Sequence, residues 1–143
     1  MRARGFAAAL SAAGVEPCGD IAYGEWSEHW GREAAGQLLA SRPDAIFCGS
    51  DQIARGVADT LRAVGRRIPD DVALVGFDNW SPMTLGALPP LTSVDMCLED
   101  VGRVAAELLL AAIGGERDHD VHTVPSRLAV RESSGGYPAA GDR

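Results

Sequence analysis

Polar and aromatic side chains follow three short apolar runs of the sequence, at the points where those runs end: Trp26 after residues 21–23, Ser50 after residues 45–48 and Asp78 after residues 72–77. If the runs are parallel strands, their carboxyl ends lie at one edge of a sheet, which is where open α/β sheets bind ligands. A carboxylate accepts hydrogen bonds from hydroxyl groups, and an aromatic face covers C–H groups. These residue types therefore predict a binding site for a small polar molecule.

Local structure offers a second explanation for each of these residues. Asp78 opens an Asp-Asn-x-Ser-Pro stretch that is typical of a turn, and Trp26 is placed to act as a hydrophobic staple at the start of a helix. Ser50 or Asp51 is placed to cap the following helix, although Ser50 could also bond a ligand hydroxyl from that position. Both interpretations stay open on the sequence alone.

The other chemically capable side chains do not form a catalytic or metal-binding pattern. Asp118, His119, Asp120 and His122 have no further ligands nearby and are more typical of an exposed loop than of a metal site. All 13 basic residues are arginine, so P-loop NTPases and Schiff-base enzymes, which depend on a lysine, are excluded. We therefore expect no catalytic residue, no metal and no cofactor.

The composition is that of one globular domain without a basic surface. The chain has 143 residues and a net charge of -7, and its arginines are scattered, so we expect it not to bind DNA specifically. No apolar run approaches the roughly 20 residues that cross a bilayer. The N-terminal residues have helical rather than signal-peptide spacing, and three widely separated cysteines suit a reducing compartment. The sequence predicts a cytoplasmic protein with no membrane association.

Apolar runs and helical patterns alternate along the chain. Helices are predicted at about 27–41, 51–64 and 98–113, between strands at 21–23, 45–48, 72–75 and 91–94, and a last strand at 121–130 is interrupted by Pro125. This alternation favours an α/β fold with a doubly wound parallel sheet that is covered on both faces. The helix at 51–64 has apolar residues on more than one side, more than a single sheet-facing stripe requires; those residues are Ile53, Val57, Ala58 and Leu61.

The order and spacing of several motifs resembles the effector-binding core of LacI/GalR-type transcriptional regulators over about residues 2–133. The motifs are Arg2-x-x-Gly5-Phe6, Gly24-Glu25-Trp26-Ser27, Asp51-Gln52-Ile53-Ala54-x-Gly56, Pro69-Asp70-Asp71-Val72-Ala73-Leu74-Val75-Gly76-Phe77-Asp78-Asn79, Pro89-Pro90-Leu91-Thr92-Ser93-Val94-Asp95 and Arg131-Glu132-Ser133. That family has the type I periplasmic-binding-protein fold, in which two α/β lobes close on a small ligand, commonly a sugar or a nucleobase.

The resemblance implies roles for particular residues. It places Asp78 and Arg2 against the ligand, Trp26 over it, and the helix at 51–64 in a homodimer interface. The predicted ligand-binding residues are Arg2, Trp26, Ser50, Asp51 and Asp78. Met96 and Cys97 depart from the more polar pattern of the family, so the resemblance does not extend a ligand contact to them.

The resemblance also implies a domain organisation. Residues 1–133 correspond to a partial ligand-sensing domain, an incomplete second lobe that lacks its first strand, with 98–113 as a crossover helix toward a missing first lobe and 134–143 as a flexible tail. DNA would be bound only through a helix-turn-helix domain that this chain does not contain.

The preferred hypothesis is an effector-sensing module of a repressor, which binds a small, sugar-like ligand and does not catalyse a reaction. A solute-binding protein of a transport system has the same fold but needs an export signal. A small flavodoxin-like enzyme would need a histidine near Asp78, and the positions of His29, His119 and His122 disfavour it.

Overall fold

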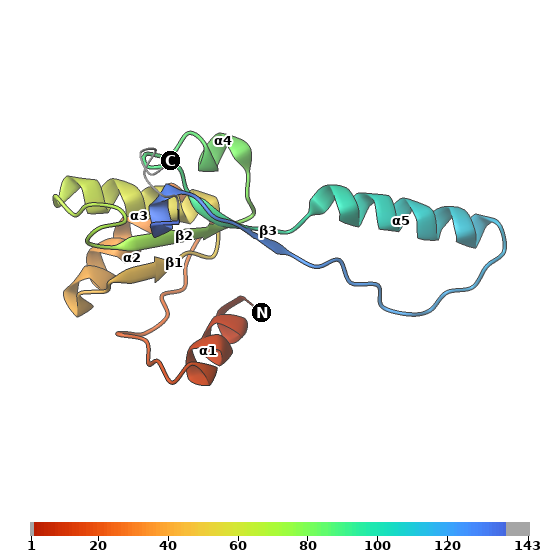
Figure 1. The fold of residues 1–143 in the computed structure, drawn as a ribbon, viewed down its shortest axis with the longest axis horizontal. Helices are drawn as coiled ribbons and strands as arrows, with labels where there is room; N and C mark the ends of the chain where they lie inside the picture. The colour runs from red at the N-terminus through yellow and green to blue at the C-terminus, as the bar shows by residue number, and fades with distance from the viewer. Residues whose placement is uncertain (1, 137–143) are drawn as a thin grey trace, which may run out of the picture.

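Four strands form one sheet in the computed structural model, which describes residues 2–136 (Figure 1). The strands lie in the order β1 (Ala45–Phe47), β2 (Ala73–Phe77), β3 (Thr92–Asp95) and β4 (Arg127–Ala129). The first three are parallel, whereas β4 runs antiparallel to β3. The sheet is therefore mixed rather than wholly parallel, because the chain returns along β3 after its last long helix.

The long helices lie where the apolar spacing predicts them. The helices are α1 (Arg2–Ala12), α2 (Glu28–Leu38), α3 (Asp51–Ala63), α4 (Ser81–Thr84) and α5 (Leu98–Ile113), with short 3₁₀ turns η1 (Leu39–Ser41) and η2 (Glu132–Ser134). Side-chain caps begin two of them: Ser27 Oγ accepts from Trp30 N–H at 3.0 Å and Ser50 Oγ accepts from Ile53 N–H at 3.2 Å. The prediction that Ser50 caps its helix is confirmed.

One face of the sheet carries the core. Ile46 of β1 and Leu74 of β2 point toward α3, whose side chains Val57 and Leu61 are buried against them. The other side of α3 is covered by α2. Because the sheet covers one side of α3 and α2 covers the other, an apolar residue on either side has a partner within the chain.

This packing corrects the predicted interface residues. Val57, Ala58 and Leu61 are 1%, 4% and 0% exposed, so they are core residues with no surface to offer a second copy. Of the four residues, only Ile53 is half-buried rather than buried. Self-association through α3 stays a prediction, and it would have to use the exposed part of this helix.

Two glycines let α2 and α3 approach closely. A Cβ atom on Gly56 would overlap the carbonyl oxygen of Glu28, and one on Gly31 would overlap the carbonyl oxygen of Ile53. A methyl group at either position would push the two helices apart and thereby open the core beneath them.

We expect Gly56→Ala to lower the free energy of unfolding by about 1–3 kcal/mol, the usual cost of overpacking a close contact. The matched control is Gly36→Ala in α2, where an added Cβ atom would meet no atom within 4 Å and the change should stabilise the helix by about 0.5–1 kcal/mol. Urea denaturation followed by circular dichroism measures both variants. Equal stabilities of the two would contradict the close approach.

The second face of the sheet is only partly covered, contrary to the prediction. Along β2, Leu74 and Gly76 are buried, whereas Ala73, Val75 and Phe77 are half-buried. The cover on that side comes from α1, where Phe6 stacks on Phe47 with ring centroids 5.5 Å apart. Burial alternates along β2 because α2 and α3 both lie on the face of the sheet that carries Leu74.

The expected strand at 21–23 is absent, and this segment is an exposed loop instead. Ile21 and Tyr23 are 41% and 75% exposed. A short extended segment becomes a strand only by pairing with a sheet edge, and within residues 2–136 the outer edge of β1 has no partner strand.

α5 projects away from the sheet and is joined to it by β3 and by the returning chain that leads to β4 (Figure 1). None of its residues is buried against another described part of the chain, and its apolar side chains Leu110 and Ile113 are 69% and 75% exposed. Among the described helices, none is both long and apolar enough to cross a membrane. Of the tail predicted to be flexible, residues 137–143 lie outside the described part.

Candidate functional site

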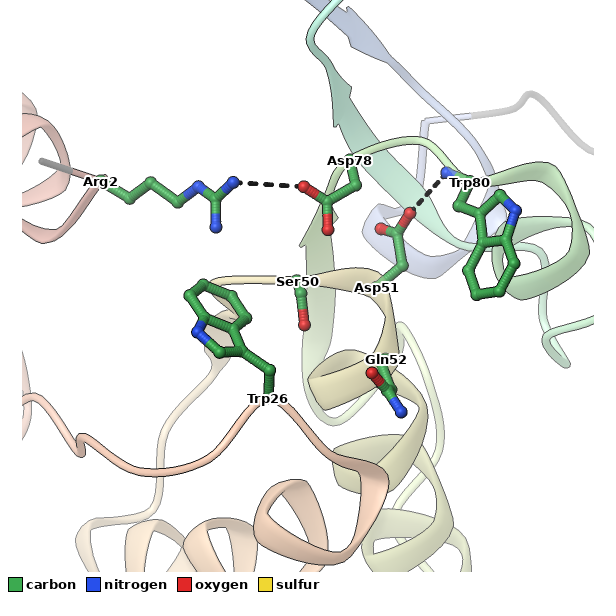
Figure 2. Close-up of a pocket in the computed structure, with 7 residues that line it drawn as sticks. All are labelled: Arg2, Trp26, Ser50, Asp51, Gln52, Asp78 and Trp80. Carbon is green, nitrogen blue, oxygen red and sulfur yellow. Dashed lines mark hydrogen bonds and ion pairs between the residues drawn. The ribbon is translucent and has the colours of Figure 1, made fainter.

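A hollow of about 410 Å³ opens where β1 and β2 end, and the side chains around it come from four separate parts of the chain (Figure 2). Its volume lies within the range of roughly 300–1,000 Å³ that small-molecule sites have. The lining residues are Arg2, Trp26, Ser50, Asp51, Gln52, Asp78 and Trp80. The structure therefore brings together all five residues that the sequence predicts for ligand binding; that they contact a ligand stays a prediction.

Asp78 and Arg2 form an ion pair at this hollow. The Arg2 Nη2 atom lies 3.2 Å from Asp78 Oδ1, and Arg2 Nη1 donates to the carbonyl oxygen of Gly49 at 2.9 Å. The guanidinium lies over Phe77, 4.0 Å from the ring centroid, and over Trp26 at 5.0 Å. Both charged side chains are about one-third exposed, at 32% and 33%, so each keeps hydrogen-bonding atoms available to a molecule in the hollow.

Burial dominates the electrostatics of Asp78. It raises the pKa of this carboxyl above its usual value, the positive charge of Arg2 lowers the pKa, and the nearby Asp51 raises it. Arg2 therefore stabilises the ionised form, which is the form that accepts hydrogen bonds from hydroxyl groups.

Asp51 lies in the wall of the hollow but is occupied by the protein. Its side chain is almost fully buried, with the residue 1% exposed. Ser93 Oγ donates to Oδ1 at 2.5 Å, and the backbone N–H of Trp80 donates to Oδ2 at 2.8 Å. Burial raises the pKa of Asp51, while these hydrogen bonds and the charge of Arg131 lower it. Both carboxylate oxygens thus serve to position Ser93 and Trp80.

The turn that carries Asp78 is held by Arg131. Asp78 and Asn79 both have positive φ angles, 105° and 52°, which is unfavourable for residues with a Cβ atom. Arg131 Nη2 donates to Asn79 Oδ1 and its Nη1 donates to the carbonyl oxygen of Leu91, both at 2.7 Å. The N–H of Asn79 also donates to Ser93 Oγ at 3.0 Å. These contacts compensate for the turn's unfavourable backbone and orient Asp78.

Two lining residues were missed by the sequence reasoning. Gln52 directly follows Ser50 and Asp51, and Trp80 lies two positions after Asp78, so both are close in sequence to residues that were identified. Both Gln52 and Trp80 could have been identified, because each lies close to the carboxyl end of a predicted strand. Trp80 stands out because it lines the hollow and is 57% exposed.

The remaining candidate chemistry lies elsewhere. Asp118 Oδ2 and His122 Nε2 are 2.7 Å apart on the surface, and no third metal-ligating side chain joins them in the part of the chain that is described. Cys48 and Cys97 are buried and Cys18 is exposed. Burial raises the pKa of the Cys48 thiol to about 12, which keeps it protonated and unreactive.

Comparison with known proteins gives consistent matches. The profile of the periplasmic binding protein-like domain matches residues 1–134. The HTH-type transcriptional regulator CelR of Thermobifida fusca is 41% identical over 92% of this chain and 40% of its own length. Catabolite control protein A of Priestia megaterium is 34% identical over 93% of this chain and 41% of its own length. The chain thus spans about two-fifths of the length of these relatives.

Solved structures agree with the sequence matches. The complex of the transcriptional regulator CelR with cellobiose has a TM-score of 0.79 and 40% identity, over 92% of this chain and 41% of that one. A LacI family transcriptional regulator from Arthrobacter sp. FB24 has a TM-score of 0.85 and 31% identity, over 95% of this chain and 52% of that one.

Proposed function

Because this chain belongs to the periplasmic-binding-protein-like domain family of the LacI-type transcriptional regulators, we propose that it is part of a repressor's effector-sensing domain and that it binds a sugar-like small molecule. The observation that supports this most strongly is the convergence of Arg2, Trp26, Ser50 and Asp78 on one hollow. No catalytic step is part of the proposal, since the named relatives are regulators. The same relatives favour a sensing module over a transport protein or a flavodoxin-like enzyme.

The chemistry of the hollow suits a polyhydroxylated ligand. Asp78 supplies two acceptor oxygens and Arg2 a planar set of donors, so together they can bind neighbouring hydroxyl groups. The exposed ring of Trp26 can cover the C–H face of a sugar ring. CelR, solved in complex with cellobiose, is a relative with such a ligand.

Two uncovered surfaces favour a second lobe. The apolar side chains of α5 are exposed along its length, and the sheet face that carries Val75 and Phe77 is only partly covered. We propose that residues 1–133 form part of a two-lobed domain in which α5 belongs with the other lobe. Ligand binding would then favour the closed arrangement of the lobes and thereby alter DNA binding by a helix-turn-helix domain outside this chain, in the cytoplasm.

We expect this chain by itself to bind cellobiose with a dissociation constant of about 1 mM or weaker. Only one lobe contacts the sugar, so its hydroxyls stay partly in water, where each hydrogen bond contributes about 0.5–1.5 kcal/mol. A few such bonds barely offset the several kcal/mol lost on immobilising a ligand.

Titration of the ¹⁵N-labelled chain with cellobiose, maltose and sucrose, followed by NMR, tests the proposal. Saturable shifts that centre on Asp78, Ser50 and Trp26 are expected with at least one sugar. An Asp70→Asn variant, which loses a charge on the exposed surface, should give the same shifts. Absence of any saturable shift up to the solubility limits of the sugars, or shifts confined to another surface, would contradict the proposed function.

A further inference from the structure

Two indole rings, those of Trp26 and Trp80, border the same hollow. Trp26 is 60% exposed and Trp80 is 57% exposed, so each keeps most of a large apolar surface in water. Figure 2 shows them on opposite sides of a floor that is made by Ser50, Asp51 and Gln52. Exposed aromatic rings of this size gain most from a ligand that removes their faces from water.

The fold uses the backbone of Trp80 but not its indole. The N–H of Trp80 donates to Asp51 Oδ2 at 2.8 Å, and its carbonyl oxygen accepts from the N–H of Thr84 at 3.0 Å. Trp80 is the N-cap residue of α4 and makes no side-chain capping bond, at a position where serine, threonine or aspartate serve better. Local structure therefore explains the backbone of this residue, and more than half of the residue stays exposed.

The indole of Trp80 is presented from a well-fixed position. The carboxylate of Asp51 that holds its N–H is itself fixed by Ser93 Oγ, and Asp51 is 1% exposed. A ring attached to a backbone that is held in this way loses little freedom when a ligand stacks on it. The backbone that carries the ring is therefore fixed before any ligand arrives.

The surface between the two indoles is polar. Ser50 Oγ accepts from Ile53 N–H, which leaves its own O–H free to donate, and the amide of Gln52 can both donate and accept. An apolar face, a polar stretch and a second apolar face therefore follow one another across the hollow. One sugar ring on Trp26 would leave the face of Trp80 in water.

We propose that Trp80 forms a second aromatic subsite and that the hollow takes a carbohydrate of two linked rings, one over Trp26 beside Asp78 and one over Trp80. This inference rests on the proposed sugar-binding function and adds the size of the ligand to it. The residues between the two rings would bind the hydroxyls near the linkage.

The test uses the full chain labelled with 5-fluorotryptophan, whose three tryptophans are Trp26, Trp30 and Trp80. Fluorine NMR follows each ring separately during titration with cellobiose, maltose or sucrose and with their component monosaccharides, and Trp30, which does not line the hollow, is an internal reference. We expect a disaccharide to shift the Trp26 and Trp80 signals with one dissociation constant, and a monosaccharide to shift Trp26 alone.

A variant pair measures the size of the effect. Trp80→Ala should weaken disaccharide binding roughly three- to tenfold relative to monosaccharide binding, as expected for the loss of one stacking contact. Leu85→Ala removes an equally exposed apolar side chain, 62% exposed, next to α4 and outside the hollow, and should leave that ratio unchanged.

The outcomes separate the two proposals. A monosaccharide that shifts both signals, a disaccharide that shifts Trp26 without Trp80, or an unchanged ratio in Trp80→Ala would overturn the second subsite and leave the sugar-binding function standing. If no sugar shifts either signal, the proposed function itself fails.

Discussion

Ser133→Ala is expected to lower the free energy of unfolding by about 2–6 kcal/mol, because it leaves two buried backbone groups without partners at about 1–3 kcal/mol each. The Ser133 hydroxyl donates to the carbonyl oxygen of Leu74 at 2.6 Å and accepts from the N–H of Thr92 at 2.8 Å. It thus bridges β2 and β3 just before their own pairing begins at Val75 and Thr92. With Ser133 1% exposed, water cannot replace the lost hydroxyl without disturbing the packing.

Ser134→Ala is the matched control for this change. Among residues 2–136 the Ser134 hydroxyl hydrogen-bonds only to the Thr92 hydroxyl, at 2.8 Å, so its removal frees no backbone group there and should cost about 1 kcal/mol or less. Urea denaturation of both variants gives the comparison. If both variants lose the same free energy of unfolding, the Ser133 bridge between β2 and β3 does not stabilise the fold in the way described.

Asp78→Asn is expected to weaken effector binding by about 1.5–3 kcal/mol, which corresponds to roughly 10- to 150-fold in the dissociation constant. The reason is that hydrogen bonds to a charged acceptor are stronger than those to an amide, and Arg2 helps to keep this carboxylate ionised in its partly buried position. The effect should be measured in a two-lobed form of the protein, where binding is tight enough for calorimetry.

Asp70→Asn makes the same chemical change at the exposed surface, where Asp70 pairs with Arg67 at 3.3 Å, and should leave the affinity unaltered. A variant that is partly unfolded would also bind less ligand. The dissociation constants are therefore compared at a temperature well below the melting temperature of each protein. Equal dissociation constants for Asp78→Asn and the unaltered protein would remove Asp78 from the site.

Features that depend on a short stretch of sequence were predictable. The spacing of apolar residues located α3 and α5, and the residue type at position 50 identified the cap of α3. The edge where Ser50 and Asp78 meet also followed from local order, since parallel neighbouring strands must end on the same side.

Features that depend on contacts between distant parts of the chain were not predictable from the sequence. Apolar residues on two sides of α3 suggested a partner molecule, but α2 supplies the second cover because Gly31 and Gly56 let the helices touch. The apolar run at 21–23 had strand character, yet it forms no strand. It does not pair with β1, whose outer edge has no partner strand within the described residues.

The sequence by itself determined the long helices α2, α3 and α5 and which chemical groups end up at the carboxyl edge of the sheet, because periodicity and strand direction are local properties. Only the tertiary structure decided that Asp51 is engaged by Ser93 and Trp80, and that Arg131 holds the turn of Asp78 through Asn79. It also decided that the ring of Trp80 borders the hollow. These residues lie up to 52 positions apart, and hydrogen bonds over such separations follow from how the whole chain packs rather than from any pattern along it.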